Sequence, residues 1–280
     1  MTTIHVAHSP DSDDAFMFYA LAEGKIQTGD RIYHHELSDI ESLNQRALNG
    51  ELEVTAISIH AYAHVSDRYA LLPHGASIGN GHGPRLVAKT PAPDDVKAGI
   101  KGKRIAVPGP LTTAYLALQL FQPDFEVVFV EFDKIVEAVL DGTVDAGLII
   151  HESQLTYTEE GLHLWLDTGE WWFSETGLPL PLGGNVVRRD LGEQLIKDIS
   201  RDLRSSIVYA LEHREAALDH AMRYARGLDR DKADEFVGMY VNDFTVDYGE
   251  SGRKGVQTLL DRAAEASLIP KRIHVEFLKY

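Results

Sequence analysis

Hydrophobic residues along the chain fall into two alternating patterns. Short runs rich in hydrophobic residues at 4–8, 54–58 and 104–107 predict buried strands, whereas the segments at 40–49 and 112–121 have helical patterns. The same patterns predict further strands at residues 127–130, 144–151 and 273–277, and further helices at 60–65, 133–141, 190–212, 214–226, 231–242 and 252–266. Strands that alternate with helices indicate an α/β fold.

A weak internal repeat indicates two lobes of similar plan. Residues 47–58 have the pattern of a helix end, a glycine and a buried strand, and residues 139–148 repeat this order. Glycine-rich segments at 79–84 and 183–184 suit a hinge, because glycine tolerates backbone rotation. The alternatives are chance similarity and two ordinary loops. The predicted division is a discontinuous lobe I at residues 1–89 and 184–280, with lobe II inserted at residues 90–183.

Charge and composition exclude several classes of partner. The chain has 27 basic and 43 acidic residues, a formal net charge of −16, which disfavours nucleic acid and anionic membranes because phosphate contacts supply most of that binding energy. No hydrophobic stretch approaches the about 18 residues of a membrane helix. The N-terminus lacks the basic and apolar regions of a secretory signal, so we expect a cytoplasmic protein. The absence of cysteine excludes disulfides, iron–sulfur clusters and thiolate metal sites.

Polar residues follow several predicted strands. Ligands of open α/β sheets bind beyond the carboxyl ends of strands, beside helix N-termini. Asp14 lies in the helix after the first strand, Ser58 ends the strand at 54–58, and Thr112 and Thr113 open a helix. Hydroxyls and free backbone amides there can hold a carboxylate or phosphate without a cation. Each residue also has a structural alternative, since Asp, Ser and Thr cap helices.

His151 follows the hydrophobic run at 144–150 and is the candidate for proton transfer. Histidine titrates nearest neutral pH and is the most frequent general base in enzymes. The alternative is a hydrogen-bonded histidine of the core. No grouping of histidines and carboxylates has the spacing of a metal site, so no metal is predicted.

Several motifs, taken in their order and spacing, resemble the 1,4-dihydroxy-6-naphthoate synthases of the futalosine route to menaquinone. The resemblance runs from Ser9-Pro10 into the helical C-terminal third. The matching stretches include Asp14-Ala15-Phe16-Met17-Phe18-Tyr19-Ala20-Leu21, Thr112-Thr113-Ala114-Tyr115, Ala146-Gly147-Leu148-Ile149-Ile150-His151-Glu152-Ser153 and Glu175-Thr176-Gly177-Leu178-Pro179-Leu180-Pro181-Leu182-Gly183. The family resemblance implies a two-lobed fold like that of type II periplasmic binding proteins, with the ligand cleft between the lobes.

The resemblance also implies an activity. It implies a carbon–carbon lyase that converts cyclic dehypoxanthinyl futalosine to 1,4-dihydroxy-6-naphthoate and a three-carbon fragment, with no cofactor and with His151 as general base. The residues that it implies in substrate binding are Asp14, Ala56, Ile57, Ser58, Thr112 and Thr113. The expected partner is therefore a small anionic precursor of an aromatic product.

The chain departs from the family pattern in two places. Residues 9–14 read Ser-Pro-Asp-Ser-Asp-Asp where the family commonly has Ser-Pro-x-Pro-Asn-Asp. Ala56 stands where some members carry a lysine that could pair with a substrate carboxylate. Recognition of a carboxylate must then rest more on amides and hydroxyls.

Two other functions share the implied fold. One is a solute-binding protein of a transporter or sensor, which normally carries a secretory signal or a lipidation cysteine. The other is the sister enzyme of the same pathway, a chorismate dehydratase. The segment at 149–153 favours the synthase, and the sequence indicates no oligomeric state.

Overall fold

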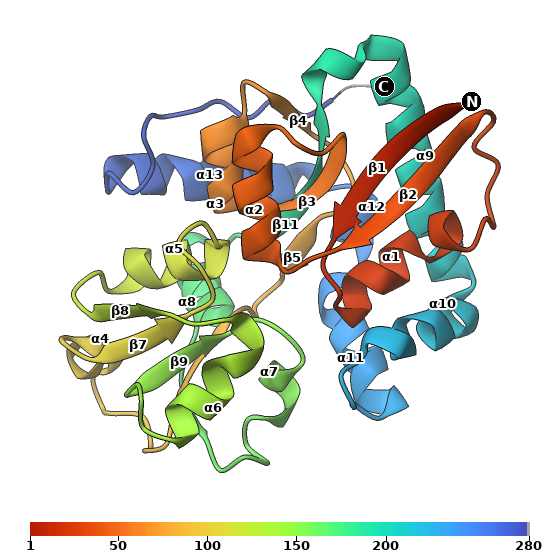
Figure 1. Cartoon of the computed structure of the whole chain (residues 1–280). Coiled ribbons are helices and arrows are strands. Elements are labelled where there is room, and N and C mark those ends of the chain that lie inside the picture. The colour runs from red at the N-terminus through yellow and green to blue at the C-terminus, as the bar shows by residue number, and fades with distance from the viewer. Residues whose placement is uncertain (279–280) are drawn as a thin grey trace.

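The computed structural model describes residues 1–278 and contains two β-sheets with helices packed around them (Figure 1). The six-stranded sheet has the order β2-β1-β3-β11-β4, with β5 also paired to β11. Its strands are β1 (Thr2–His8), β2 (Arg31–Leu37), β3 (Val54–Ser58), β4 (Tyr69–Leu71), β5 (Ser77–Gly79) and β11 (Leu180–Arg188). We call the part of the molecule around this sheet lobe I.

The five-stranded sheet forms lobe II and has the order β10-β6-β9-β7-β8. Its strands are β6 (Arg85–Ala88), β7 (Arg104–Val107), β8 (Glu126–Phe129), β9 (Ala146–Ile149) and β10 (His163–Asp167). In each sheet three neighbouring strands run parallel, β2-β1-β3 and β8-β7-β9, and the other pairs are antiparallel. The α/β class expected from the sequence is confirmed.

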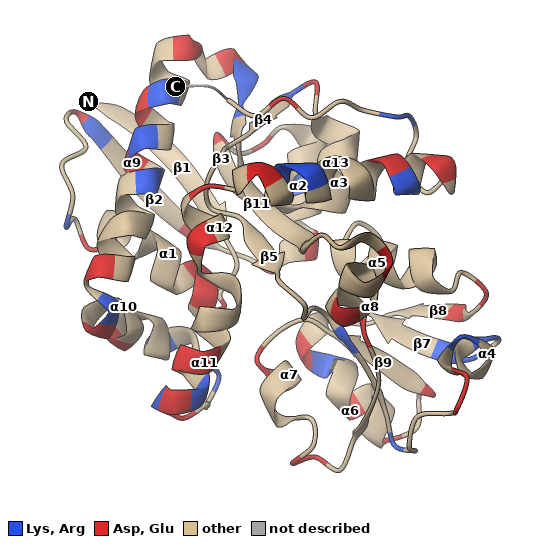
Figure 2. Ribbon diagram, turned by 180° about the vertical axis from the view of Figure 1, so that it is seen from behind, with Lys and Arg blue, Asp and Glu red and all other residues tan. Residues whose placement is uncertain are grey.

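Helices surround both sheets. Those that precede β6 are α1 (Ser12–Ala22), α2 (Ile40–Asn49) and α3 (Ile59–Val65), and those from β6 to β11 are α4 (Val96–Ile100), α5 (Thr113–Phe121), α6 (Ile135–Leu140), α7 (Ser153–Thr156) and α8 (Thr168–Thr176). The helices of the C-terminal third are α9 (Glu193–Glu212), α10 (Arg214–Ala221), α11 (Arg230–Tyr240), α12 (Asp243–Val246) and α13 (Gly249–Glu265). Acidic and basic residues are interspersed on these outer helices, whereas the strands of both sheets are largely uncharged (Figure 2).

The hydrophobic core of lobe I forms between α1, the sheet and α9. Phe16 and Met17 of α1 pack in one buried cluster with Val6 of β1 and with Ile199 and Leu203 of α9. Burying such side chains stabilises the fold by roughly 1.5–3 kcal/mol each. This packing fixes the N-terminal end of α1 at the edge of lobe I that faces lobe II.

The chain crosses between the lobes twice, at residues 80–84 and 168–179. The crossing segments touch, and a Cβ atom on Gly169 would overlap the carbonyl oxygen of His82, so only glycine fits there. Strand β6 pairs with β9 and β10 of lobe II, although the predicted division places residues 85–88 in lobe I. The division at residues 89/90 and 183/184 stays a prediction. In the structure the sheet of lobe II begins with β6 at Arg85, and the chain returns to the sheet of lobe I with β11 at Leu180.

Two sequence expectations differ from the structure. The predicted strand at 273–277 is wrong: within the described residues it contributes only an isolated bridge between Phe277 and Leu71. Strand β2 was not expected, because it is an edge strand whose polar and hydrophobic residues are half-buried or exposed. Its pairing with β1 fixes its conformation, and no hydrophobic run marks it.

Candidate active site

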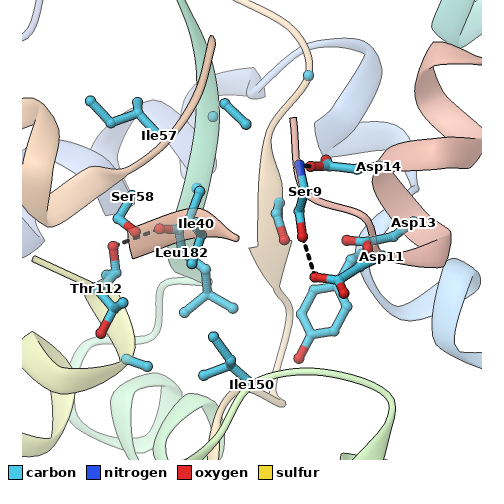
Figure 3. Close-up of a pocket in the computed structure, with 18 of the residues that line it drawn as sticks. Ser9, Asp11, Asp13, Asp14, Ile40, Ile57, Ser58, Thr112, Ile150 and Leu182 are labelled. Atoms are coloured by element: carbon cyan, nitrogen blue, oxygen red, sulfur yellow. Dashed lines mark hydrogen bonds between the residues drawn. The ribbon is translucent and has the colours of Figure 1, made fainter. Parts of the chain in front are cut away.

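A cleft opens between the two lobes. Figure 3 shows its walls: Ser9, Asp11 and Asp14 approach from one side, Ser58 and Thr112 from the other, and Ile150 from lobe II. All six predicted substrate-binding residues line this cleft, namely Asp14, Ala56, Ile57, Ser58, Thr112 and Thr113. His151 is not among the lining residues, although Ile150, which precedes it, is.

The floor of the cleft comes from β3 and β11. These strands are antiparallel, and their register places Ala56 opposite Asn185 and Ser58 opposite Gly183. Because side chains alternate along a strand, these four residues share one face of the sheet, and all four line the cleft. Ile57 points the other way, into the buried core of lobe I. Ala56 and Gly183 are small, and this keeps the floor open.

Ser58 is held with its hydroxyl available to a ligand. The Asn44 side chain accepts a hydrogen bond from the Ser58 amide at 2.9 Å and donates one to Ser58 Oγ at 3.0 Å. Ser58 is the N-cap residue of α3, yet its hydroxyl makes no capping hydrogen bond. Its hydroxyl proton therefore has no acceptor among residues 1–278 and can be donated into the cleft.

The hydroxyls of Thr112 and Thr113 both form hydrogen bonds with backbone groups of the protein. Thr112 Oγ1 donates to Gly109 O at 2.9 Å and accepts from Tyr115 N at 3.3 Å, which is a helix cap. Thr113 Oγ1 accepts from His60 N at 3.1 Å and donates to Leu182 O at 2.5 Å. Thr112 therefore has the structural role that was the alternative to substrate binding, and Thr113 joins lobe II to lobe I.

The acidic loop after β1 forms the opposite wall. Asp14 accepts a hydrogen bond from Ser9 N at 2.7 Å, and Ser9 Oγ donates to Asp11. Burial raises the pKa of Asp14 to about 7, and burial together with the neighbouring Asp14 also raises the pKa of Asp13. No lysine, arginine or histidine occurs among the described residues that line the cleft. Its recognition of an anion must therefore rest on hydroxyls and amides.

His151 lies beside the cleft, at the junction of the lobes. It is 5% exposed, its ring packs edge-to-face on Phe132 with centroids 5.2 Å apart, and Nε2 lies 3.1 Å from Ser153 Oγ. Nδ1 has no partner within the described chain. Burial lowers the pKa of His151 to about 4; Asp11 raises this pKa by a smaller amount, and Arg226 lowers it further. The imidazole is therefore neutral at pH 7.

Sequence reasoning missed three residues of the site. Asn44 is fully buried in α2, Asn185 lies in β11, and Tyr240 reaches the cleft from the end of α11. The glycine pair before Asn185 indicated a crossing segment, but nothing in the sequence pairs β11 with β3. A polar residue on the buried face of α2 was the only signal for Asn44.

Among the described residues we find neither a group of side chains arranged to bind a metal ion nor a membrane-spanning helix. Over residues 1–278, no group of three or more His, Asp or Glu side chains is placed to hold a metal ion. No helix in the same range is long and hydrophobic enough to span a membrane.

Two α/β lobes joined by two crossings, with a polar cleft between them, define a protein of the periplasmic-binding-protein-like class. An alkanesulfonate-binding protein from Xanthomonas axonopodis pv. citri matches this chain with a TM-score of 0.71 at 14% identity, covering 98% of this chain and 96% of that one. At this identity the likeness shows the fold alone.

Sequence comparison shows the family. Residues 4–265 match the family described as menaquinone biosynthesis, and the chain belongs to it. Curated 1,4-dihydroxy-6-naphthoate synthases from Thermus thermophilus and Streptomyces coelicolor are 42% and 39% identical, over 96% of this chain and 96% and 95% of their own lengths. A crystal structure of a protein from Archaeoglobus fulgidus matches with a TM-score of 0.91 at 49% identity, over 95% of this chain and 98% of that one. The resemblance inferred from the motifs is confirmed.

Proposed function

We propose that the protein is a carbon–carbon lyase that converts cyclic dehypoxanthinyl futalosine to 1,4-dihydroxy-6-naphthoate and a three-carbon fragment, without a cofactor. The observation that carries the proposal is the match to two curated synthases at 42% and 39% identity over nearly the whole length. The cleft is lined by polar residues of both lobes, as recognition of a polar substrate requires.

His151 is the proposed general base. Its pKa of about 4 leaves the imidazole unprotonated at neutral pH, and when Nε2 donates to Ser153, Nδ1 is the nitrogen free to accept a proton. Cleavage of the carbon framework requires removal of a proton from a hydroxyl or a carbon of the substrate. His151 follows Ile150, which lines the cleft, and we propose that it takes this proton when the lobes enclose the substrate.

Ser58 is the proposed donor to the substrate. Its hydroxyl is oriented by Asn44 and faces a cleft without lysine or arginine among its described residues. The acidic wall opposite, with Asp11, Asp13 and Asp14, disfavours a carboxylate there. We therefore place the anionic end of the substrate near Ser58 and its hydroxyl groups near the acidic wall.

Incubation of the purified protein with cyclic dehypoxanthinyl futalosine, in buffer containing EDTA, tests the proposal. We expect 1,4-dihydroxy-6-naphthoate to accumulate over many turnovers, detected by chromatography and mass spectrometry. Parallel incubation with chorismate separates the sister dehydratase, since dehydration of chorismate would contradict the proposal. Tight binding of a small molecule without turnover would instead indicate a solute-binding protein.

A further inference from the structure

The turn that carries His151 is docked on lobe I. Glu152 Oε1 accepts hydrogen bonds from Ser12 N at 3.3 Å and from Ser12 Oγ at 3.0 Å. Two residues on, Gln154 Oε1 accepts a hydrogen bond from Tyr240 OH at 2.9 Å. Glu152 and Gln154 belong to lobe II, whereas Ser12 and Tyr240 belong to lobe I. The contacts therefore span the cleft and exist only while the lobes are together.

Glu152 supplies a helix cap that α1 does not make for itself. The N-cap residue Asp11 forms no side-chain hydrogen bond to the first turn of α1. The first amide groups of a helix need acceptors and attract negative charge. The Glu152 carboxylate meets both needs from the opposite lobe, through the amide and hydroxyl of Ser12. The N-terminus of α1 is thus capped across the cleft.

Arg226 completes the contact. Its guanidinium lies 2.9 Å from Asp11 Oδ1 and 3.7 Å from Glu152 Oε2, and it stacks over the Phe132 ring with 4.5 Å between Cζ and the centroid. The backbone of Arg226 has φ +50°, an uncommon value for a residue other than glycine, so surrounding contacts must hold it. Arg226 therefore joins Asp11 of its own lobe to Glu152 and Phe132 of lobe II.

The environment of Glu152 fits a role in closure. Its side chain is only 3% exposed, and a buried carboxylate is costly unless it is paired and hydrogen-bonded. Ser12 donates hydrogen bonds to Oε1, whereas Oε2 has no hydrogen-bond partner within the described residues and lies 3.7 Å from Arg226. Ser12 and Arg226 both come from lobe I. When the lobes separate, the carboxylate returns to water, so the contact can form and break with the motion of the lobes. We call Ser12, Glu152 and Arg226 the interlobe latch.

We propose that Glu152 is a positioning residue: through the interlobe latch it holds the cleft closed and sets the place of the neighbouring His151 imidazole beside the substrate. Glu152 follows His151 directly, so docking of its carboxylate on α1 fixes the backbone that carries the base. The latch acts on closure whatever the reaction is, and only its effect on catalysis rests on the proposed function.

Distances between spin labels test closure directly. The chain has no cysteine, so Lys25→Cys in lobe I and Glu137→Cys in lobe II, both exposed positions, give a uniquely labelled pair. We expect one main interlobe distance in the parent protein and a longer, broader distribution in Glu152→Ala and in Ser12→Ala. Glu152→Ala removes the acceptor, whereas Ser12→Ala removes the hydroxyl donor and keeps the backbone amide, so its opening should be smaller. Because the two variants weaken the contact from opposite sides, neither result depends on the folding of one variant alone. Unchanged distances in both variants would overturn the proposal.

Glu159→Ala is the matched control. Glu159 lies in the same segment and bridges the lobes through Lys232 at 2.6 Å, but this pair is largely exposed to solvent. Exposed ion pairs contribute little, so we expect parent-like distances in this variant. An opening as large as that of Glu152→Ala would show that any lost charge on this surface loosens the lobes, and would contradict the latch.

The kinetic readout separates positioning from stability. We expect kcat of Glu152→Ala to fall by about tenfold or more because the base is misplaced, with partial recovery in Glu152→Gln, whose amide oxygen still accepts from Ser12. Parent-like kcat in an opened Glu152→Ala variant would overturn the link to His151. Failure of the proposed function would be recognised separately, because the parent protein itself would then show no turnover.

Discussion

Asn44 and Ser58 form a reciprocal pair in which the amide side chain accepts from the Ser58 backbone at 2.9 Å and donates to its hydroxyl at 3.0 Å. Both polar groups of the Asn44 side chain are thereby used on one residue, and Asn44 is fully buried. The orientation of Ser58 is set from beneath by α2. Asn44 uses the amide proton and the hydroxyl oxygen of Ser58. The hydroxyl proton of Ser58 is left free to be donated into the cleft.

Ser58→Ala should raise KM for the substrate with little change in kcat. The variant removes one donor, and a hydrogen bond to a charged group contributes about 1.5–3 kcal/mol, which corresponds to roughly a tenfold to hundredfold rise in KM. Asn44→Asp should raise KM as well, because a carboxylate would accept the Ser58 hydroxyl proton and withdraw it from the cleft. Steady-state kinetics of both variants check this. An unchanged KM in a folded Ser58→Ala variant would exclude contact with the substrate.

Thr112→Ala should lower stability and leave KM unchanged. The hydroxyl caps α5 through Tyr115 N, and the loss of such a cap costs about 1 kcal/mol in the free energy of unfolding. Chemical denaturation and steady-state kinetics on one preparation distinguish the two roles of this residue. A raised KM with parent-like stability would show that Thr112 binds the substrate.

Asp14→Asn should stabilise the protein more at pH 8 than at pH 5. Burial raises the pKa of Asp14 to about 7, above the ordinary value of 3.8, so the folded protein binds the proton more tightly than the unfolded chain. The stability that this proton contributes is complete below the unfolded value and is lost as the pH rises through about 7. Asparagine can still accept from Ser9 N and carries no charge. A Tm difference between variant and parent that does not grow from pH 5 to pH 8 would contradict the raised pKa.

Sequence patterns predicted several elements whose residues are buried on one or both faces, but not the short buried strand β4. Strands β1, β3 and β7 were expected because each is a short segment rich in hydrophobic residues, and the carboxyl ends of β1 and β3 led to Asp14 and Ser58 as candidate site residues. The pairing of β11 with β3 joins residues far apart in the chain, so no local pattern reveals that Asn185 lies beside Ala56. Side-chain hydrogen bonds also join residues far apart in the chain. The hydroxyl of Thr113 accepts from His60 N and donates to Leu182 O, and no sequence pattern places these residues close together.

The position of His151 was predicted only in part. The sequence indicated that a strand delivers it near the cleft, and β9 does end at Ile149, two residues before it. Its depressed pKa arises from burial where the two lobes meet, with Phe132 against the ring. A surface formed by two lobes has no signature in either segment alone, and for the same reason the latch of Ser12, Glu152 and Arg226 could not be foreseen.

The central claim is that His151 is the general base, and measurement of kcat and Tm for His151→Asn on a single preparation tests it most directly. Asparagine approximates the size and one hydrogen bond of the imidazole but cannot accept a proton near neutral pH. Loss of a general base removes a factor of about 10²–10⁴ in rate, so kcat should fall by that amount while Tm and KM stay close to the parent values. In the parent enzyme the loss of rate that comes from protonation of His151 should appear only as the pH approaches about 4, well below the titration of Asp14 near 7. A stable His151→Asn enzyme that retains most of its kcat would contradict the account.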